Sequence, residues 1–100
     1  MSLANQVAIV TGAGRGIGQA IAQRLARSGA AVIAVDLRGY RADRVAGELT
    51  AAGGKAIGIE ADVTTQAGAQ QTARRALNAF GAIHILVNNV GGPRVESFLD

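Results

Sequence analysis

The sequence predicts an α/β protein with a doubly wound parallel sheet, and three observations support that prediction. Short runs of apolar, mostly β-branched residues alternate along the 100 residues with longer segments of helical periodicity. A glycine-dense turn joins the first apolar run to the first helical segment. Polar residues follow directly after each apolar run. Alternation of this kind is typical of parallel sheets with right-handed crossovers and helices on both faces.

The first strand is expected at residues 7–11 and the first helix at residues 17–28. Ile17 and Ile21 begin an apolar stripe at every fourth position, which is the periodicity of an amphipathic helix. Gly29 is expected to be the C-cap of this helix, because glycine tolerates the left-handed conformation found at helix ends.

The rest of the chain repeats the same unit. Val45 and Leu49 belong to the inner stripe of a second helix, which a glycine pair ends. A third helix follows, with Thr64 as the expected N-cap and Leu77 on the inner side. The expected strands are 7–11, 31–36, 56–60 and 84–87, and the expected helices are 17–28, 42–52 and 65–80.

Composition excludes several classes of function. The excess of ten Lys and Arg over seven acidic residues is too small to argue for nucleic-acid binding. The chain has no cysteine, so disulfides and thiolate metal sites are excluded. No apolar run approaches the ~18 residues of a membrane-spanning helix, and the first residues lack the features of a secretory leader. The expectation is a cytoplasmic protein without a membrane partner.

The turn after the first strand reads T-G-A-G-R-G-I-G over residues 11–18. Glycine allows positive φ angles and lets a ligand approach the bare backbone. The N–H groups in the first turn of the following helix have no intrahelical acceptor, and the helix dipole adds positive potential there. The turn is therefore suited to a phosphate or pyrophosphate, although a glycine-rich turn by itself is also a common tight connection.

Spacing distinguishes three kinds of nucleotide loop. A Walker A loop, G-x4-G-K-S/T, is excluded because no glycine stands five positions after Gly12 or Gly14 and the first lysine is Lys55. The G-x-G-x-x-G fingerprint is excluded because its third glycine would fall at Ile17. What remains is T-G-x3-G-x-G, with Gly16 as its middle glycine.

This spacing resembles the cofactor loop of the short-chain dehydrogenase/reductase family. The resemblance implies a Rossmann-type fold with strand order 3-2-1-4. It also implies that Gly12, Arg15, Gly16, Ile17 and Gly18 contact a dinucleotide cofactor.

Asp36 stands twenty residues after Gly16, at the end of the second apolar run. A carboxylate there can accept hydrogen bonds from both hydroxyls of the adenosine ribose, and it would repel a 2′-phosphate. NAD is therefore expected rather than NADP. Arg15 and Arg38 could in principle hold a 2′-phosphate, but the neutral Leu37 directly follows the carboxylate and is expected to line the site.

Two further segments resemble motifs of the same family. Asp62 and Val63 are similar to the pair after the third strand that binds the adenine ring. The sequence N-N-V-G, whose last three residues are Asn89, Val90 and Gly91, is similar to the N-N-A-G motif that lines the cofactor. Valine here replaces the usual alanine. The two asparagines before glycine would also suit a simple turn.

The family's catalytic serine, its Tyr-x3-Lys pair and an asparagine on a fourth helix are expected to lie beyond residue 100. The single tyrosine, Tyr40, is followed four residues later by Arg44 and not by lysine. His84 is the only histidine and begins an apolar strand, so a structural role is expected. No catalytic residue and no metal ligand is assigned within this chain.

The resemblance implies that residues 1–100 are the N-terminal part of a single NAD-binding domain. The whole protein would transfer hydride between a small alcohol or carbonyl substrate and the nicotinamide. The alternative is a non-catalytic nucleotide-binding or scaffold fragment. A homo-oligomer is implied for the full-length protein. A nucleic-acid partner is disfavoured because the arginines are dispersed and no aromatic platform is present.

Overall fold

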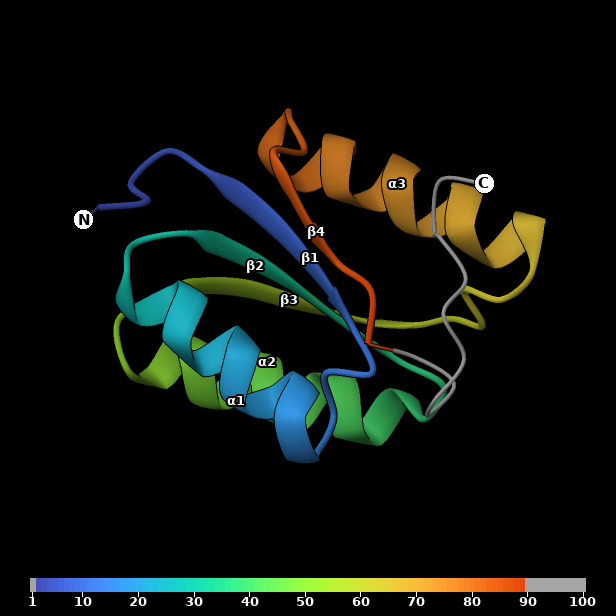
Figure 1. Cartoon of the computed structure of the whole chain (residues 1–100), viewed down its shortest axis with the longest axis horizontal. Coiled ribbons are helices and arrows are strands. Elements are labelled where there is room, and N and C mark those ends of the chain that lie inside the picture. Colours follow the sequence, from blue (N-terminus) through green and yellow to red (C-terminus); the bar gives the residue numbers. More distant parts are fainter. Residues whose placement is uncertain (1, 90–100) are drawn as a thin grey trace.

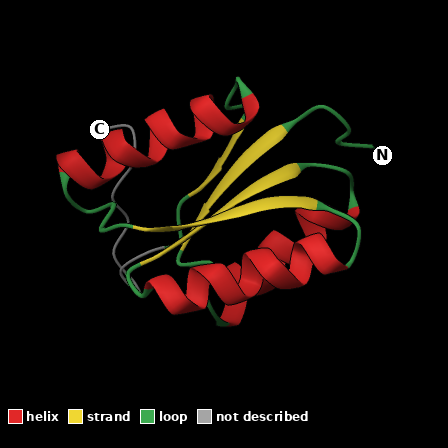
Figure 2. Ribbon diagram, turned by 180° about the vertical axis from the view of Figure 1, so that it is seen from behind, coloured by secondary structure: helices red, strands yellow, loops and turns green. Residues whose placement is uncertain are grey.

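The structure is a computed structural model that describes residues 2–89. A central sheet carries α3 on one face and α1 and α2 on the other (Figures 1 and 2). The elements, in chain order, are β1 (Val7–Thr11), α1 (Gly16–Arg27), β2 (Ala31–Asp36), α2 (Gly39–Ala51), β3 (Lys55–Glu60), α3 (Gln66–Phe80) and β4 (Ile85–Val87).

The sheet has the order β3-β2-β1-β4, and all its pairings are parallel. This confirms the predicted α/β class and strand order. In the register, Thr11 lies beside Val35 and Asp36 lies beside Glu60. Because parallel strands all end at the same edge, the sheet brings together the polar residues that follow β1, β2, β3 and β4.

The core has one layer on each face of the sheet. Ile9 and Ile33 belong to the layer that also contains Ala76 of α3. Val10 and Val32 belong to the opposite layer, with residues of α1 and α2. Burial on both faces explains why β1 and β2 are continuous apolar runs without alternation.

The inner face of α1 differs from the expected stripe. Ile17 is 71% exposed, whereas Gly18 and Ala22 are buried. The reason is the close packing of the first turn of α1. A Cβ at Gly18 would lie only 2.1 Å from the carbonyl oxygen of Gly12, so the helix approaches the loop through its smallest residues. Ile17 therefore fits the apolar stripe of the sequence but does not belong to the buried face of α1.

The ends of α1 and α2 also differ from the expectation. Ser28 is the C-cap of α1, and Gly29 follows it with a φ of 103°. Helix α2 begins at Gly39, so it includes Tyr40, and it ends at Ala51. Its first turn lies before the buried positions begin at Ala42, which is why hydrophobic periodicity did not detect this turn.

Helix α3 begins after Thr65, not after Thr64. The Thr65 hydroxyl accepts the backbone N–H of Gly68 at 3.0 Å, which makes Thr65 the N-cap. The Thr64 hydroxyl instead donates to the carboxylate of Asp62. Two adjacent threonines are equivalent in the sequence, and only the position of Asp62 distinguishes them.

The buried residues of α3 are Gly68, Thr72 and Ala76. Leu77, expected on the inner side, is 48% exposed. A Cβ at Gly68 would lie 2.0 Å from the carbonyl oxygen of Asp62, so α3, like α1, packs through a glycine against the loop that precedes it. Small residues therefore set the buried face, and the larger Leu77 lies beside it.

Strand β4 begins at Ile85, one residue later than expected, and β3 begins at Lys55, one residue earlier. His84 lies just before β4. Its backbone N–H donates to the Val7 carbonyl, and its Nδ1 accepts the Val7 N–H, both at 2.9 Å. These bonds attach the start of β4 to the start of β1, which is the structural role predicted for His84. Among residues 2–89, no helix has the length and hydropathy needed to cross a membrane.

Candidate cofactor-binding site

The turn between β1 and α1 requires glycine at two positions for conformational reasons. Gly12 and Gly16 both have a φ of 61°. A Cβ at Gly12 would also lie 2.2 Å from the backbone oxygen of Asn89. At Gly16 a Cβ would meet no atom of residues 2–89 within 4 Å, so the bare backbone of Gly16 is exposed. Gly12 thus packs against Asn89, and Gly16 is open to a ligand.

Gly18 closes the packed side of the loop. A Cβ there would lie 2.1 Å from the Gly12 carbonyl oxygen and 2.7 Å from Nδ2 of Asn89. The turn, the first turn of α1 and the end of β4 therefore meet with no room for a side chain. The structure brings together Gly12, Gly18 and Asn89, which the sequence singled out separately.

The N-terminus of α1 carries no anion of its own. Arg15 is the N-cap residue, but its side chain makes no capping hydrogen bond. The first turn contains no acidic residue. The N–H groups of this turn and the dipole of α1 are therefore available to an anionic ligand, and the exposed Arg15 adds positive charge. Ile17 is also exposed here.

Asp36 lies against the same loop from the end of β2. Its Oδ2 accepts the backbone N–H of Gly14, and its Oδ1 accepts that of Arg38, both at 2.9 Å. A carboxylate has about four lone-pair sites, so each oxygen can accept one more hydrogen bond, as from a ribose hydroxyl. The next residue, Leu37, is exposed at this edge of the sheet.

Asp62 and Val63 follow β3 at the same edge. The Ala61 N–H donates to the Asp36 carbonyl at 3.1 Å, which joins the ends of β2 and β3. Asp62 is exposed, and its Oδ1 accepts the Thr64 N–H at 3.0 Å. Val63 is half-buried and packs against the core layer beneath α3. Asp62 is thus oriented by its own turn and accessible to a ligand.

Thr11 is a site residue that the sequence reasoning missed. It is fully buried at the end of β1, and its hydroxyl accepts the Asn89 N–H at 2.8 Å. The same hydroxyl lies 3.3 Å from both the Val87 carbonyl oxygen and Oδ1 of Asn88. It joins β1 to the segment after β4. A hydroxyl that ends an otherwise apolar run was the available signal.

Replacing Thr11 with valine is expected to destabilise the fold by ~1–3 kcal/mol, because the Asn89 N–H would lose its acceptor. Thr72→Val is the matched control. Thr72 is equally buried, but its hydroxyl only donates to the Gly68 carbonyl at 2.9 Å, so its removal leaves no donor unpaired. Chemical denaturation of both variants measures the difference. Equal losses would contradict the role given to Thr11.

Val90 and Gly91, two of the predicted cofactor-binding residues, lie outside the described residues. Tyr40 is exposed on α2 with the Arg41 guanidinium 5.6 Å from its ring centre. In the described part of the chain, no three His, Asp or Glu side chains are close enough to hold a metal ion.

The family model described as short chain dehydrogenase matches residues 6–100 of this chain. The chain therefore belongs to the short-chain dehydrogenase family, and the four-stranded parallel sheet and three helices of residues 2–89 have the Rossmann-type arrangement of that family. The family implies a nicotinamide cofactor, NAD or NADP.

Curated relatives include oxidoreductases of several kinds. An uncharacterized oxidoreductase of Methylorubrum extorquens is 47% identical over 89% of this chain and 36% of its own length. The 1,6-dihydroxycyclohexa-2,4-diene-1-carboxylate dehydrogenase of Acinetobacter baylyi is 42% identical over 88% of this chain and 33% of its own length. The chain thus spans about a third of the length of these relatives.

A solved structure supports the same assignment. The crystal structure of a hydroxysteroid dehydrogenase from Escherichia coli superimposes with a TM-score of 0.88 at 38% identity, covering 91% of this chain and 39% of that one.

Proposed function

We propose that this chain is the cofactor-binding part of a short-chain oxidoreductase that uses NAD. The whole protein would transfer hydride between an alcohol or carbonyl substrate and the nicotinamide ring. Residues 1–100 would then be the N-terminal part of one dinucleotide-binding domain. A cytoplasmic location and homo-oligomeric assembly belong to the same proposal, and they rest on composition and on the family resemblance.

The observation that supports the proposal most strongly is the hydrogen bond between Asp36 and the glycine loop. Oδ2 of Asp36 accepts the Gly14 N–H at 2.9 Å, so the carboxylate lies beside the uncapped N-terminus of α1. A dinucleotide has a pyrophosphate next to an adenosine ribose. The proposed cofactor would place the pyrophosphate against the N–H groups of α1 and the ribose hydroxyls on Asp36.

The remaining contacts are proposed from the same arrangement. Gly12 and Gly18 would keep the loop flat enough for the pyrophosphate, and Gly16 would face it. Asp62 and Val63 would border the adenine ring. Asn89 would line the inner part of the cofactor, together with Val90 and Gly91. Bound NAD would supply the hydride acceptor, and these residues would only bind and orient it.

The preference for NAD over NADP rests on charge. Asp36 would repel a 2′-phosphate, and its two oxygens already orient the backbone around the ribose position through Gly14 and Arg38. Arg15 and Arg38 are exposed near this position and could favour NADP. The negative charge of Asp36 is proposed to outweigh the two arginines, because hydrogen bonds to both of its oxygens fix the carboxylate in place and because the neighbouring Leu37 adds no positive charge.

Oxidation of a panel of secondary alcohols by the intact protein, followed as NADH formation, tests the proposed reaction. Turnover with NAD that exceeds turnover with NADP is expected. Binding of NADH without turnover of any alcohol or carbonyl would support the non-catalytic alternative instead. Absence of binding of either cofactor would contradict the proposal as a whole.

Residues 1–100 produced alone are expected to have no dehydrogenase activity and to associate. The only tyrosine, Tyr40, lacks a lysine four residues later, and β4 is an edge strand in the sheet described here. Exposed edge groups pair readily with another chain. Light scattering and an alcohol oxidation assay on this segment measure both effects. A monodisperse monomer with cooperative unfolding, or any turnover, would contradict the expectation.

A further inference from the structure

Arg44 of α2 contacts the glycine loop, although it is thirty residues away in the sequence. We propose that Arg44 is a positioning residue that holds the Gly14 peptide in the conformation required for pyrophosphate binding. This inference rests on the proposed function, because it concerns the same dinucleotide. It adds to that function a residue outside the glycine motif.

The backbone of Gly14 is held from two sides. Its N–H donates to Oδ2 of Asp36 at 2.9 Å, and its carbonyl oxygen accepts a hydrogen bond from Nη2 of Arg44 at 2.7 Å. A Cβ at Gly14 would lie 2.5 Å from both Oδ2 of Asp36 and Cβ of Arg41. Residues of β2 and α2 therefore contact the middle of the loop from both sides, and Gly14 is buried between them.

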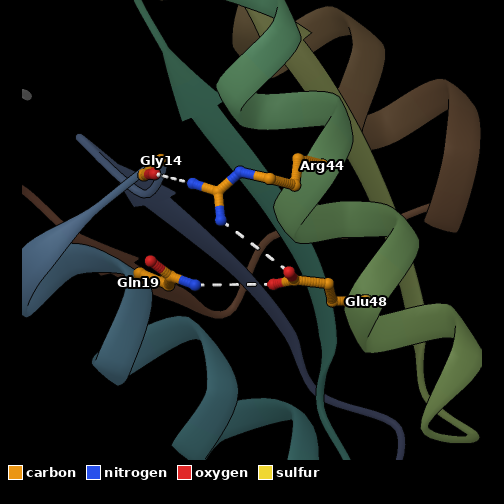
Figure 3. Close-up of polar contacts among 4 residues, drawn as sticks. All are labelled: Gly14, Gln19, Arg44 and Glu48. Atoms are coloured by element: carbon orange, nitrogen blue, oxygen red, sulfur yellow. Dashed lines mark hydrogen bonds and ion pairs between the residues drawn. The ribbon is translucent and has the colours of Figure 1, made fainter.

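A second set of contacts orients the Arg44 side chain (Figure 3). Its Nη1 lies 3.7 Å from Oε2 of Glu48, one turn further along α2. Oε1 of Glu48 accepts a hydrogen bond from Nε2 of Gln19 on α1 at 3.4 Å. The chain of contacts thus runs from the loop through α2 and back to the helix whose N-terminus would face the pyrophosphate.

The ion pair itself contributes little to stability. The side chains of Arg44 and Glu48 are 48% and 50% exposed, and exposed pairs at this helical spacing are weak. The hydrogen bond to Gly14 is different, because it is short and charge-assisted. The contribution of Arg44 is therefore the orientation of one peptide group.

That orientation matters for the anion site. Gly14 lies two residues before Gly16, where α1 and its free N–H groups begin. A loop that is already ordered loses less conformational entropy when the ligand binds. Without Arg44 the peptide group between Gly14 and Arg15 could rotate, because its carbonyl oxygen would lose the hydrogen bond. The backbone N–H groups at the start of α1 would then no longer point toward one position. The loss should be confined to ligands that carry the pyrophosphate.

The test compares Arg44→Met with Arg41→Met in the intact protein. Arg41→Met is the matched control because it removes an equal charge from the same helix and keeps the Cβ that lies beside Gly14, and no hydrogen bond joins the Arg41 guanidinium to Gly14 in the described structure. The ligands are NADH, NADPH, ADP-ribose and adenosine. Affinities for NADH and ADP-ribose are measured by calorimetry, and that for adenosine by competition against NADH.

Arg44→Met is expected to lower the affinities for NADH and ADP-ribose about tenfold, the scale of one charge-assisted hydrogen bond. The affinity for adenosine should stay within about twofold of the parent value. The ratio of NADH to NADPH affinity should stay the same. Arg44→Lys, which retains the charge and an ammonium group able to donate to the Gly14 carbonyl oxygen, should lose less affinity for NADH. If Arg44→Met does not fold, the affinities of Arg44→Lys and Arg41→Lys for the same four ligands are compared instead.

Three results would overturn the inference while the proposed function stands. The first is NADH affinity equal in the Arg44 and Arg41 variants. The second is an equal loss for adenosine and ADP-ribose, which would indicate a general structural role. The third is a selective loss of NADPH, which would make Arg44 a contact of the 2′-phosphate. No binding of NADH by the parent protein would overturn the proposed function and this inference together.

Discussion

Replacing Gly18 with valine is expected to lower NADH affinity by ~100-fold or more, because no room exists for a Cβ at this position. A Cβ there would lie 2.1 Å from the Gly12 carbonyl oxygen. Gly12 has little room to withdraw, because a Cβ built on it would lie 2.2 Å from the Asn89 backbone oxygen. The first turn of α1 would have to move away from β1, and its N–H groups would move with it.

Gly12→Val should have a comparable effect, since it combines the φ of 61° with a Cβ 2.2 Å from the Asn89 oxygen. Gly16→Ala separates these two causes. Gly16 has the same φ, but no described protein atom lies within 4 Å of a Cβ there, so alanine adds a conformational strain of ~1–2 kcal/mol and a methyl group on the side proposed to face the pyrophosphate. Its NADH affinity should fall by roughly tenfold.

Calorimetric titration of NADH into each variant, after circular dichroism has established that it folds, measures these losses. The expected order of affinity is parent, then Gly16→Ala, then the two valine variants. A folded Gly18→Val protein with unchanged affinity would mean that the turn is only a connection between β1 and α1.

Replacing Asp36 with alanine is expected to reduce the preference for NADH over NADPH by ~10-fold or more, the scale of a lost charge-assisted hydrogen bond of ~1.5–3 kcal/mol. The structure adds a second consequence. The carboxylate also accepts the N–H groups of Gly14 and Arg38, so its removal should weaken both cofactors. The affinity for NADH should fall more than that for NADPH, because the substitution also removes the charge that repels the 2′-phosphate of NADPH.

Asp36→Asn is the matched variant for this experiment. Asparagine has the same shape and retains one oxygen acceptor, which can still receive the Gly14 N–H, but it removes the charge. The preference should therefore fall as it does in Asp36→Ala, while the common loss for both cofactors should be smaller. Dissociation constants for NADH and NADPH measure both quantities. Equal affinities for the two cofactors in the parent protein would contradict the role assigned to Asp36.

The strands were predictable from the sequence because each contains a short apolar run that a polar residue follows directly. Burial on both faces makes β1 and β2 uniformly apolar, and the parallel order followed from the family resemblance. The helical faces were less predictable. Ile17 and Leu77 fit an apolar stripe, yet the first turns of α1 and α3 pack against the loops after β1 and β3 through Gly18 and Gly68, where a side chain would not fit. Hydrophobic periodicity cannot detect packing through glycine.

The candidate site was predictable where residue type and strand end coincide. Gly12, Gly18 and Asn89 lie in contact, and Asp36 lies against the loop. Thr11 and Arg44 were not found, because their partners Asn89 and Gly14 are distant in the sequence. Thr11 stands in the T-G-x3-G-x-G motif, but its hydrogen bond to Asn89, like that of Arg44 to Gly14, is identified only by the three-dimensional structure.

A crystal structure of the intact protein with bound NAD tests the central claim most directly. The account predicts that the pyrophosphate lies within hydrogen-bond distance of the N–H groups at the start of α1. It also predicts that both adenosine ribose hydroxyls donate to Asp36 while the Gly14 N–H remains bonded to Oδ2. A pyrophosphate located away from the glycine loop, or a ribose that does not contact Asp36, would contradict it.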